Sequence, residues 1–152
     1  MIFIYTDGAS RGNPGPGGYG VVMLYGSLRK ELSEGFRLTT NNRMELWSVI
    51  AALEALKKED LMITVYSDSK YIVDAVEKKW VFDWEKKNFK DKKNADLWKR
   101  FLELYRKHRV KFVWVKGHSS TKENNRCDEL AVAAALSKNL HVDEGYESSK
   151  SS

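Results

Sequence analysis

The chain has 152 residues, the length of one ordinary domain, and 42% of them are hydrophobic, enough for a core that needs no disulfide or metal. No apolar stretch approaches the roughly 18 residues of a membrane span, and the opening MIFIYT lacks the pattern of a secretory signal. One cysteine, Cys127, cannot form an internal disulfide and fits a reducing compartment. These features exclude a disordered chain, a disulfide scaffold and a membrane protein, and they predict one cytoplasmic domain.

Charge is concentrated in one segment. The net charge is +5, and residues 78–100 carry all of it, with nine basic side chains against four acidic ones. The aromatic residues of this window are Trp80, Phe82, Trp84, Phe89 and Trp98. Basic residues among aromatics can neutralise phosphates and offer flat faces to sugars and bases. The alternative is a solvated, lysine-rich pair of helices whose aromatics face the core, and composition leaves both interpretations open.

The first half of the chain predicts strands and then a helix. Strands rich in β-branched and aromatic residues cover 2–6, 19–25 and 28–37. The glycine- and proline-rich segment between Gly8 and Gly20 is predicted to be a shaped loop or a hairpin connection. A helix over 43–58 follows, because its apolar residues recur at helical spacing.

The second half alternates strands and helices. It predicts a strand over 61–67 and a helix directly after it, then a short helical stretch, a helix over 95–108, a strand over 110–116 and a last helix over 126–137. The whole order predicts an α/β domain over residues 1–140, with a five-stranded mixed sheet of three antiparallel strands plus two parallel ones, flanked by helices. Residues 141–152 are predicted to form a polar, mobile tail.

Four acidic residues occupy positions where chemistry is expected. Asp7 and Asp68 follow two predicted strands, and sites in open α/β sheets gather at the carboxyl ends of strands. Each has a structural alternative: Asp7 can open an Asp-Gly turn, and Asp68 can cap the next helix. Glu45 and Asp128 each stand three residues after an asparagine, which is the spacing of a capping box at a helix start.

Taken together, these acids favour a metal site. Asp7, Glu45, Asp68 and Asp128 come from two strand ends and two helix starts that can face one edge of the sheet. Clustered carboxylates repel one another and are stable mainly when cations lie among them. Oxygen ligands without cysteine or histidine suit Mg²⁺ or Mn²⁺ and argue against zinc. Two such ions about 4 Å apart can support phosphodiester cleavage.

Six sequence blocks carry a family resemblance. TDGAS, GNPGPGGYG, TTNNRMEL, YSDSKY, WVKGHS and RCDELA occur in the order seen in type 1 ribonuclease H, the bacterial ribonuclease HI family, and span about residues 2–137. The resemblance implies the ribonuclease H-like fold and a monomeric endonuclease for the RNA strand of RNA/DNA hybrids. It further implies two Mg²⁺ ions, with Mn²⁺ as a substitute, and products with 5′-phosphate and 3′-hydroxyl ends.

The resemblance also implies roles for the catalytic residues. Asp7 would bridge both ions, Glu45 and Asp68 would hold one of them, and Asp128 would help hold the ion that activates water. His118, in the KGHSS segment, resembles the family histidine that aids proton movement or product release. The remaining two histidines match no motif and are predicted to be inert: His108 and His141.

Substrate residues are implied in the same way. Asn13, Asn41 and Asn42 resemble asparagines that contact minor-groove edges and ribose 2′-hydroxyls, although asparagine also suits turns and caps. Thr40 resembles part of a pocket for a DNA-strand phosphate, and Trp80 an aromatic of the DNA-binding channel. Lysines complete the predicted substrate surface. They are Lys70, which replaces a glutamine of many relatives, and Lys86, Lys87 and Lys90 of a basic protrusion, WEKKNFKDKKNADLW (residues 84–98), which is shorter than in the best-known bacterial members.

Two other functions compete with the hybrid nuclease. One is a non-catalytic module that binds RNA/DNA hybrids, which the four acids disfavour because a binder gains nothing from clustered repulsive charges. The other is a DNA nuclease on the same fold, which the TTNNRMEL block disfavours because its asparagines resemble readers of 2′-hydroxyls.

Overall fold

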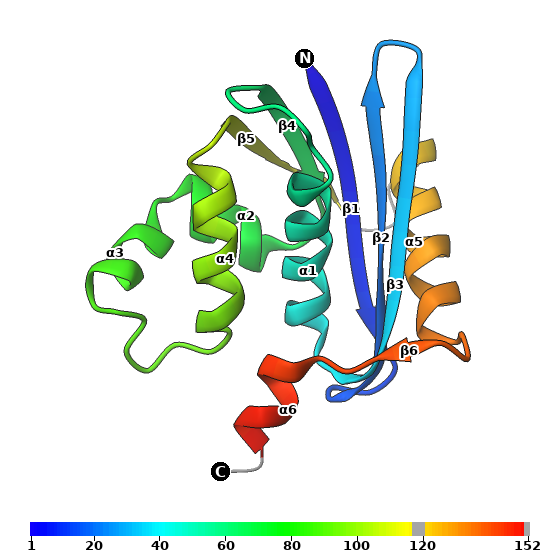
Figure 1. Ribbon diagram of the computed structural model, residues 1–152, viewed down its shortest axis with the longest axis vertical. Coiled ribbons are helices and arrows are strands. Elements are labelled where there is room, and N and C mark those ends of the chain that lie inside the picture. Colours follow the sequence, from blue (N-terminus) through cyan, green and yellow to red (C-terminus); the bar gives the residue numbers. More distant parts are fainter. Residues whose placement is uncertain (117–120, 151–152) are drawn as a thin grey trace.

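A computed structural model describes residues 1–116 and 121–150, and within them six strands form one mixed sheet with the order β5-β4-β1-β2-β3-β6 (Figure 1). The strands are β1 (Ile2–Ser10), β2 (Gly15–Tyr25), β3 (Leu28–Thr39), β4 (Met62–Ser67), β5 (Arg109–Trp114) and β6 (Leu140–His141). The helices are α1 (Asn41–Glu54), α2 (Lys70–Glu77), α3 (Trp80–Lys86), α4 (Ala95–Tyr105), α5 (Lys122–Ala135) and α6 (Glu144–Lys150). None of the described helices is long and apolar enough to cross a membrane.

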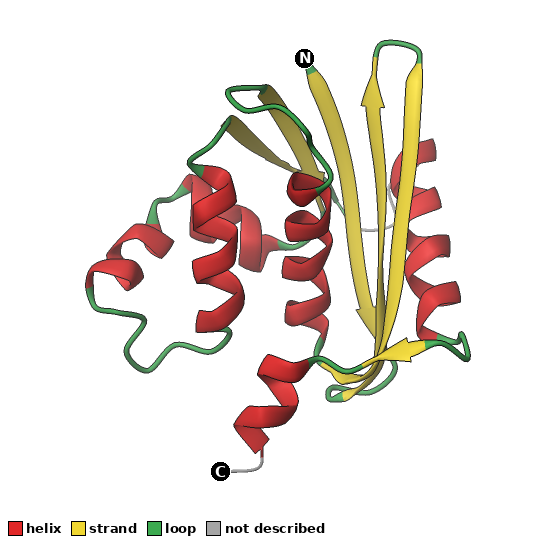
Figure 2. Ribbon diagram, viewed as in Figure 1, coloured by secondary structure: helices red, strands yellow, loops and turns green. Residues whose placement is uncertain are grey.

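The pairing of the strands confirms the predicted α/β class. Strands β1, β2 and β3 pair antiparallel, whereas β4 runs parallel to β1 and β5 runs parallel to β4. The structure adds a sixth strand, the two-residue β6, which pairs parallel with β3. Helices cover both faces of the sheet (Figure 2), as burial of a mixed sheet requires.

Glycines set the distance between the sheet and its helices. Most of the segment predicted as a loop between Gly8 and Gly20 is strand, and the connection itself is only Arg11–Pro14. A Cβ on Gly20 would lie 2.2 Å from the carbonyl oxygen of Cys127 in α5, and one on Gly8 would lie 2.4 Å from the amide nitrogen of Glu45 in α1. The glycines therefore serve close backbone approach within strands. The segment does hold the hairpin connection between β1 and β2, one of the two predicted interpretations, but the connection is much shorter than the segment.

Three helices have different bounds from those predicted, and one of them, α4, ends at Tyr105 and not at residue 108. Helix α1 ends at Glu54, and the charged residues after it turn through Asp60, whose φ is 56°, to reach β4. Helix α5 begins at Lys122 after the N-cap residue Thr121, which is four residues before the predicted start. Asp128 therefore lies in the second turn of α5 and not at its start, so the capping-box alternative for this residue was wrong.

The C-terminal segment forms defined structure as far as it is described. The predicted boundary at residue 140 falls on the first residue of β6, and α6 follows where a polar tail was expected. The side chain of Asp143 is fully buried and accepts hydrogen bonds from Arg43 Nε, at 2.7 Å, and from Thr39 Oγ1, at 2.8 Å. Arg43 also pairs with Asp96 of α4. A short polar sequence gives no hydrophobic periodicity, so this ion-pair anchor escaped the sequence analysis.

The basic window of residues 78–100 forms α3, the loop after it and the start of α4. Of its aromatics, Trp98 and Phe89 belong to the core, and Phe82 and Trp84 pack against it. Trp80 is different, with 45% of its surface exposed. The alternative that the aromatics of this window face the core therefore holds for four of them. Trp80 is exposed, just before the lysines of the basic protrusion.

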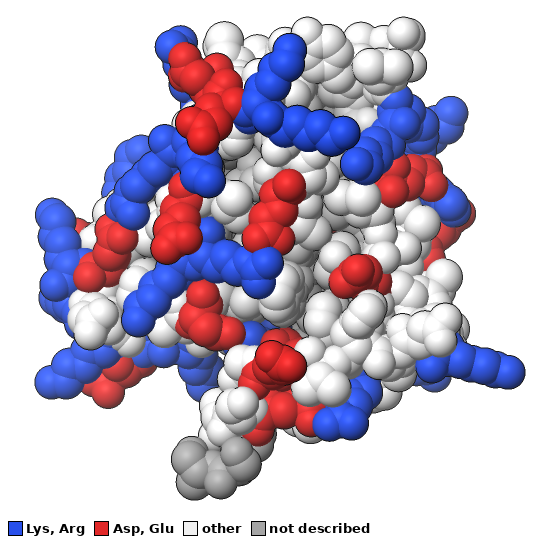
Figure 3. Space-filling model, in the orientation of Figure 1, with Lys and Arg blue, Asp and Glu red and all other residues white. Residues whose placement is uncertain are grey.

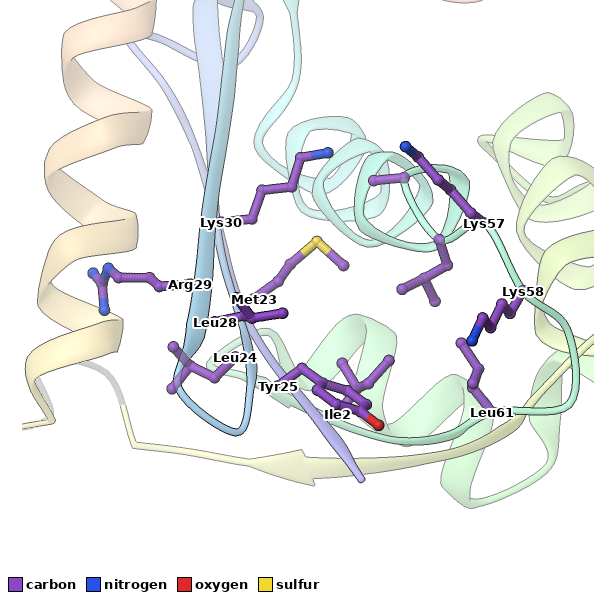
Figure 4. Close-up of a pocket in the computed structure, with 12 residues that line it drawn as sticks. Ile2, Met23, Leu24, Tyr25, Leu28, Arg29, Lys30, Lys57, Lys58 and Leu61 are labelled. Carbon is purple, nitrogen blue, oxygen red and sulfur yellow. The ribbon is translucent and has the colours of Figure 1, made fainter.

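An apolar groove lies at the other end of β1 from Asp7. Ile2, Met23 and Leu61 line it, and Lys30 and Lys57 stand at its rim (Figure 4). Its volume is about 370 Å³, but no carboxylate, histidine or cysteine lines it. The groove therefore lacks the carboxylate, imidazole and thiol groups from which a metal site is usually built.

Candidate active site

Three of the four predicted carboxylates converge. Asp7, Glu45 and Asp68 each offer an oxygen that lies within 4.8 Å of the others. Asp128 stands outside this group of three but lines the same cavity, whose volume is about 430 Å³. The structure thus brings together the four acids predicted from the sequence, which are separated by up to 121 positions along the chain.

Register and close packing explain why these acids meet. Tyr5 of β1 pairs with Tyr66 of the parallel strand β4, so Asp7 and Asp68, two residues further along each chain segment, come to the same level of the sheet. Glu45 arrives from α1 because Gly8 lets that helix touch β1. On the other strand, Asp7 pairs with Gly20, which packs against α5 one residue before Asp128.

The structural roles considered for three of these acids, two helix caps and a turn, do not apply to them. Thr40 caps α1 by accepting a hydrogen bond from the amide of Arg43, and Ser69 caps α2 by accepting one from Ile72. Asp7 lies inside β1 and not in a turn. Neither Glu45 nor Asp68 is therefore needed to cap a helix.

Without a bound cation, the carboxylates of the cavity repel one another. Burial, followed by the charges of Asp68 and Asp128, raises the pKa of Asp7 to about 8. Burial and the charge of Asp7 raise the pKa of Glu45 well above its ordinary value. Glu45 Oε1 is buried and has no hydrogen-bond partner. An unpartnered acceptor among repelling carboxylates fits a hard divalent cation, because such a cation supplies both the missing partner and the missing positive charge.

Amide side chains stand beside the carboxylates. Asn41 and Asn42, on the first turn of α1, are exposed and line the cavity. Asn13 lies next to them, and its Oδ1 accepts a hydrogen bond from the backbone amide of Asn41 at 3.1 Å. Asn13 therefore also supports the start of α1, which is the structural alternative considered for asparagine at this position.

A second cavity lies between exposed Trp80 and the lysines of the protrusion. Trp80, Trp84, Lys87 and Lys90 are among the residues that line a cavity of about 470 Å³. Lys86 is exposed on α3 but does not line this cavity. Figure 3 shows basic and acidic side chains interspersed over the α3–α4 side of this face, so the protrusion is not an uninterrupted cationic patch.

The histidines do not reach the cavity where the structure describes them. His118 lies outside the described residues, and its predicted role stays a prediction. His108 Nδ1 accepts a hydrogen bond from the amide of Leu61, and His141 lies 3.8 Å from Glu34. Neither of these two lines the carboxylate cavity, as expected for residues outside the motifs.

Comparison with known proteins agrees with this geometry. Residues 1–136 match the sequence profile of the RNase H family. The chain belongs to the RNase H family. It is 55% identical to ribonuclease H of Syntrophus aciditrophicus, over 96% of this chain and 87% of the relative, and 57% identical to ribonuclease H of Desulforamulus reducens, over 93% and 92%.

Solved structures of the same family superpose on this RNase H. LC9-RNase H1, described as a type 1 RNase H with the type 2 active-site motif, matches with a TM-score of 0.82 and 33% identity, over 99% of this chain and 81% of that one. LC11-RNase H1, solved in complex with an RNA/DNA hybrid, matches with a TM-score of 0.68 and 30% identity, over 89% and 96%.

Several residues around the site of this RNase H were missed from the sequence. Tyr71 lines the cavity, and its hydroxyl accepts hydrogen bonds from Trp98 Nε1 and Asn94 Nδ2. Trp114 contacts both Asp68 and Lys70. The signal for Tyr71 was its place in YSDSKY, and the signal for Trp114 was an aromatic at the end of the strand parallel to β4.

Proposed function

We propose that this RNase H is an endonuclease that hydrolyses the RNA strand of RNA/DNA hybrids with two Mg²⁺ ions, giving 5′-phosphate and 3′-hydroxyl ends. The observation that carries the proposal is the cavity of four carboxylates, in which a buried oxygen of Glu45 has no partner. The hybrid substrate is supported by the relative LC11-RNase H1, whose structure holds an RNA/DNA hybrid.

The carboxylates divide into two sets by position. Asp7 stands between the others, since it lies close to Glu45 and Asp68 and its pKa responds to Asp128. Asp7 would therefore bridge the two ions, Glu45 and Asp68 would hold one, and Asp128 would help hold the other. When bound, such ions stabilise charge on the phosphate and lower the pKa of water. Mn²⁺ has the same preference for oxygen ligands and would substitute.

The chain's own residues position the substrate. Asn41 and Asn42 lie at the rim of the cavity, where their amides can hydrogen-bond to the 2′-hydroxyl that distinguishes RNA from DNA. Thr40, at the start of the same helix, would hold a phosphate of the DNA strand. Trp80 and the protrusion lysines would follow the duplex backbone, because cations and aromatic faces are what a nucleic-acid channel requires.

His118 completes the proposed machinery. We assign it proton movement or product release, because an imidazole gains and loses a proton near neutral pH. Its place in the WVKGHS block, one of those that resemble the family, supports the assignment.

Cleavage of labelled duplexes tests the proposal. RNA/DNA, RNA/RNA and DNA/DNA duplexes are incubated with Mg²⁺, Mn²⁺ or EDTA, and the ends of the products are mapped. We expect cleavage of the hybrid alone, with either metal and not with EDTA. Binding of the hybrid without cleavage would favour a binding module, and equal cleavage of DNA would favour a DNA nuclease.

Two further arms of the experiment address the mechanism. Asp7→Asn should abolish cleavage, whereas Asp60→Asn, an exposed acid paired with Arg109 outside the cavity, should cleave like the wild type. A hybrid with 2′-O-methyl RNA should bind and resist cutting. Near-normal turnover by a folded Asp7→Asn protein would end the two-ion mechanism.

We also propose that the protein acts as a monomer in the cytoplasm. Its cysteine is buried and unpaired, which fits a reducing compartment. Sedimentation at several protein concentrations checks the monomer, since a dimer would show a mass that rises with concentration.

A further inference from the structure

Trp114 holds an unusual position beside the cavity. It is the last residue of β5, and 42% of its surface is exposed. Its Nε1 donates a hydrogen bond to the backbone carbonyl oxygen of Asp68 at 3.2 Å. The Nζ atom of Lys70 lies 4.7 Å from the centre of its ring. One exposed indole thus contacts both a proposed metal ligand and the next basic residue along the chain.

We propose that Trp114 is a positioning residue that holds the ammonium group of Lys70 at the rim of the cavity, where it binds a phosphate of the substrate backbone and stays away from the carboxylates. The inference rests on the proposed function, because it presumes that a nucleic-acid strand crosses this cavity. It assigns the lysine that replaces a glutamine of many relatives to a phosphate and not to a base.

The need for such a residue follows from the charges of the cavity. Among the described residues that line it, Lys70 is the one cation, and it faces four carboxylates. An ammonium group is attracted to such a cluster, and a lysine paired with Asp68 would neutralise a ligand that the metal requires. In the described part of the chain, Lys70 instead places its charge over the ring of Trp114. Tryptophan has the most favourable ring face for a cation.

The ring is fixed well enough to act as a support. Trp114 pairs in register with Ser67, directly before Asp68, and the amide of Val115 donates a hydrogen bond to the carbonyl oxygen of Ser67 at 2.9 Å. Together with the indole N–H bond, these contacts hold both ends of the residue against the strand that carries Asp68. The side chain of Lys70 therefore rests on a rigid surface that is tied to the metal ligand itself.

A purely structural role would look different. Trp114 does not belong to the hydrophobic core, and neighbouring side chains leave much of its ring open to solvent. Truncating it therefore removes little packing, and the fold should tolerate Trp114→Leu. The truncation does remove the surface under Lys70 and the indole N–H bond to Asp68, and Trp114→Phe removes the second without the first.

The first experiment measures binding and not cleavage. Affinity for a hybrid with 2′-O-methyl RNA is measured by fluorescence anisotropy in Mg²⁺ at several salt concentrations. Lys70→Gln should flatten the plot of log affinity against log salt by about 0.7–0.9, the value for one phosphate contact. Trp114→Leu should give most of the same change although Lys70 is intact, and the double variant should add nothing. Lys57→Gln, a lysine of the apolar groove, is the matched control and should keep the wild-type slope.

The second experiment measures metal binding without substrate. The Mg²⁺ concentration for half-maximal thermal stabilisation is determined for the same variants. Trp114→Leu should raise it several-fold, because the released ammonium competes for the carboxylates, and adding Lys70→Gln should restore the wild-type value. Trp114→Phe keeps a ring under the lysine and should stay close to the wild type, which guards against a variant that simply folds poorly.

These results separate the inference from the proposed function. Wild-type slope and Mg²⁺ requirement in Trp114→Leu, or fully additive effects of the two substitutions, would overturn the positioning role. Failure of the wild-type protein to cut hybrids would overturn the proposed function, whereas the Mg²⁺ measurement would still report on Trp114 and Lys70.

Discussion

Asp143→Asn tests how the C-terminal segment is anchored. The carboxylate of Asp143 is fully buried and accepts hydrogen bonds from Nε and Nη2 of Arg43, at 2.7 and 2.8 Å. Arg43 is only 3% exposed, so its charge depends on its acidic partners. Although burial opposes the charged form, the hydrogen bonds that Arg43 donates to Asp96 and Asp143 raise its pKa above the ordinary value. The substitution removes one of the two charges that balance the guanidinium.

The size of the effect follows from the geometry. Removing one partner of a buried ion pair costs about 3–5 kcal/mol. The lower end applies here, because Asp96 still forms two hydrogen bonds with Arg43 and an asparagine oxygen can accept one. For a domain of this length about 1 kcal/mol lowers Tm by about 2–4 °C, so we expect a loss of about 6–12 °C.

Thermal and urea unfolding, followed by circular dichroism, measure this loss. Glu147→Gln is the control, since it breaks the bidentate pair with Arg37 on the same C-terminal segment but at the surface, where such a pair contributes less than about 1 kcal/mol. Adding Arg43→Met to Asp143→Asn should cost less than the sum of the two single changes, because the charge left unpaired is then gone. An Asp143→Asn protein that is no less stable than Glu147→Gln would refute the anchoring role. So would fully additive losses of stability from Asp143→Asn and Arg43→Met.

Three other predictions concern the site. Asp7→Asn should stabilise the metal-free protein, and the gain should grow as pH rises from about 4 to 8, because the pKa of Asp7 is raised from 3.8 to about 8 and the wild type loses stability across that window; a gain of at most about 5 kcal/mol at pH 8 is expected, and a gain independent of pH in urea titrations would contradict the cause. His118→Ala should lower turnover by roughly 10²-fold without abolishing it, and an unchanged rate in steady-state assays would make this histidine inert. Neutralising five protrusion lysines together (Lys86, Lys87, Lys90, Lys92 and Lys93) should raise KM and flatten the slope of log affinity against log salt by about 0.7–0.9 per lost contact. The kcat at saturating hybrid should change little. A collapse of kcat would show that the protrusion aligns the scissile phosphate.

The fold and the site could be predicted from the sequence where pattern and chemistry agree. Strand periodicity and the order of elements predicted the mixed sheet, and two acids placed after predicted strands indicated the cavity that holds Asp7 and Asp68, although β1 continues past Asp7 to Ser10. Prediction failed where a distant contact decides the structure. Nothing local in the sequence shows that Asp143 meets Arg43, a hundred positions away, or that Trp114 rests on Asp68.

The glycine-rich segment between Gly8 and Gly20 is another place where a distant contact decides the local structure. Glycine and proline predict a turn when they are read locally, yet Gly18 and Gly20 lie in β2 because α5 needs their missing side chains. The start of α5 was misplaced for a related reason: its first turn, KENN, is polar and carries no apolar stripe, so the prediction began only at Arg126.

The contacts at Gly8 and Gly20 have a consequence for how the site can change. Here the spacing between carboxylates is set by direct contact between backbone groups, with no side chain between them. Core residues elsewhere can exchange volume and repack without changing this spacing. One added methyl group at either glycine would push α1 or α5 away from the sheet, and Glu45 or Asp128 would move with its helix. The interior of the protein can therefore change in sequence while the dimensions of its carboxylate cavity stay the same.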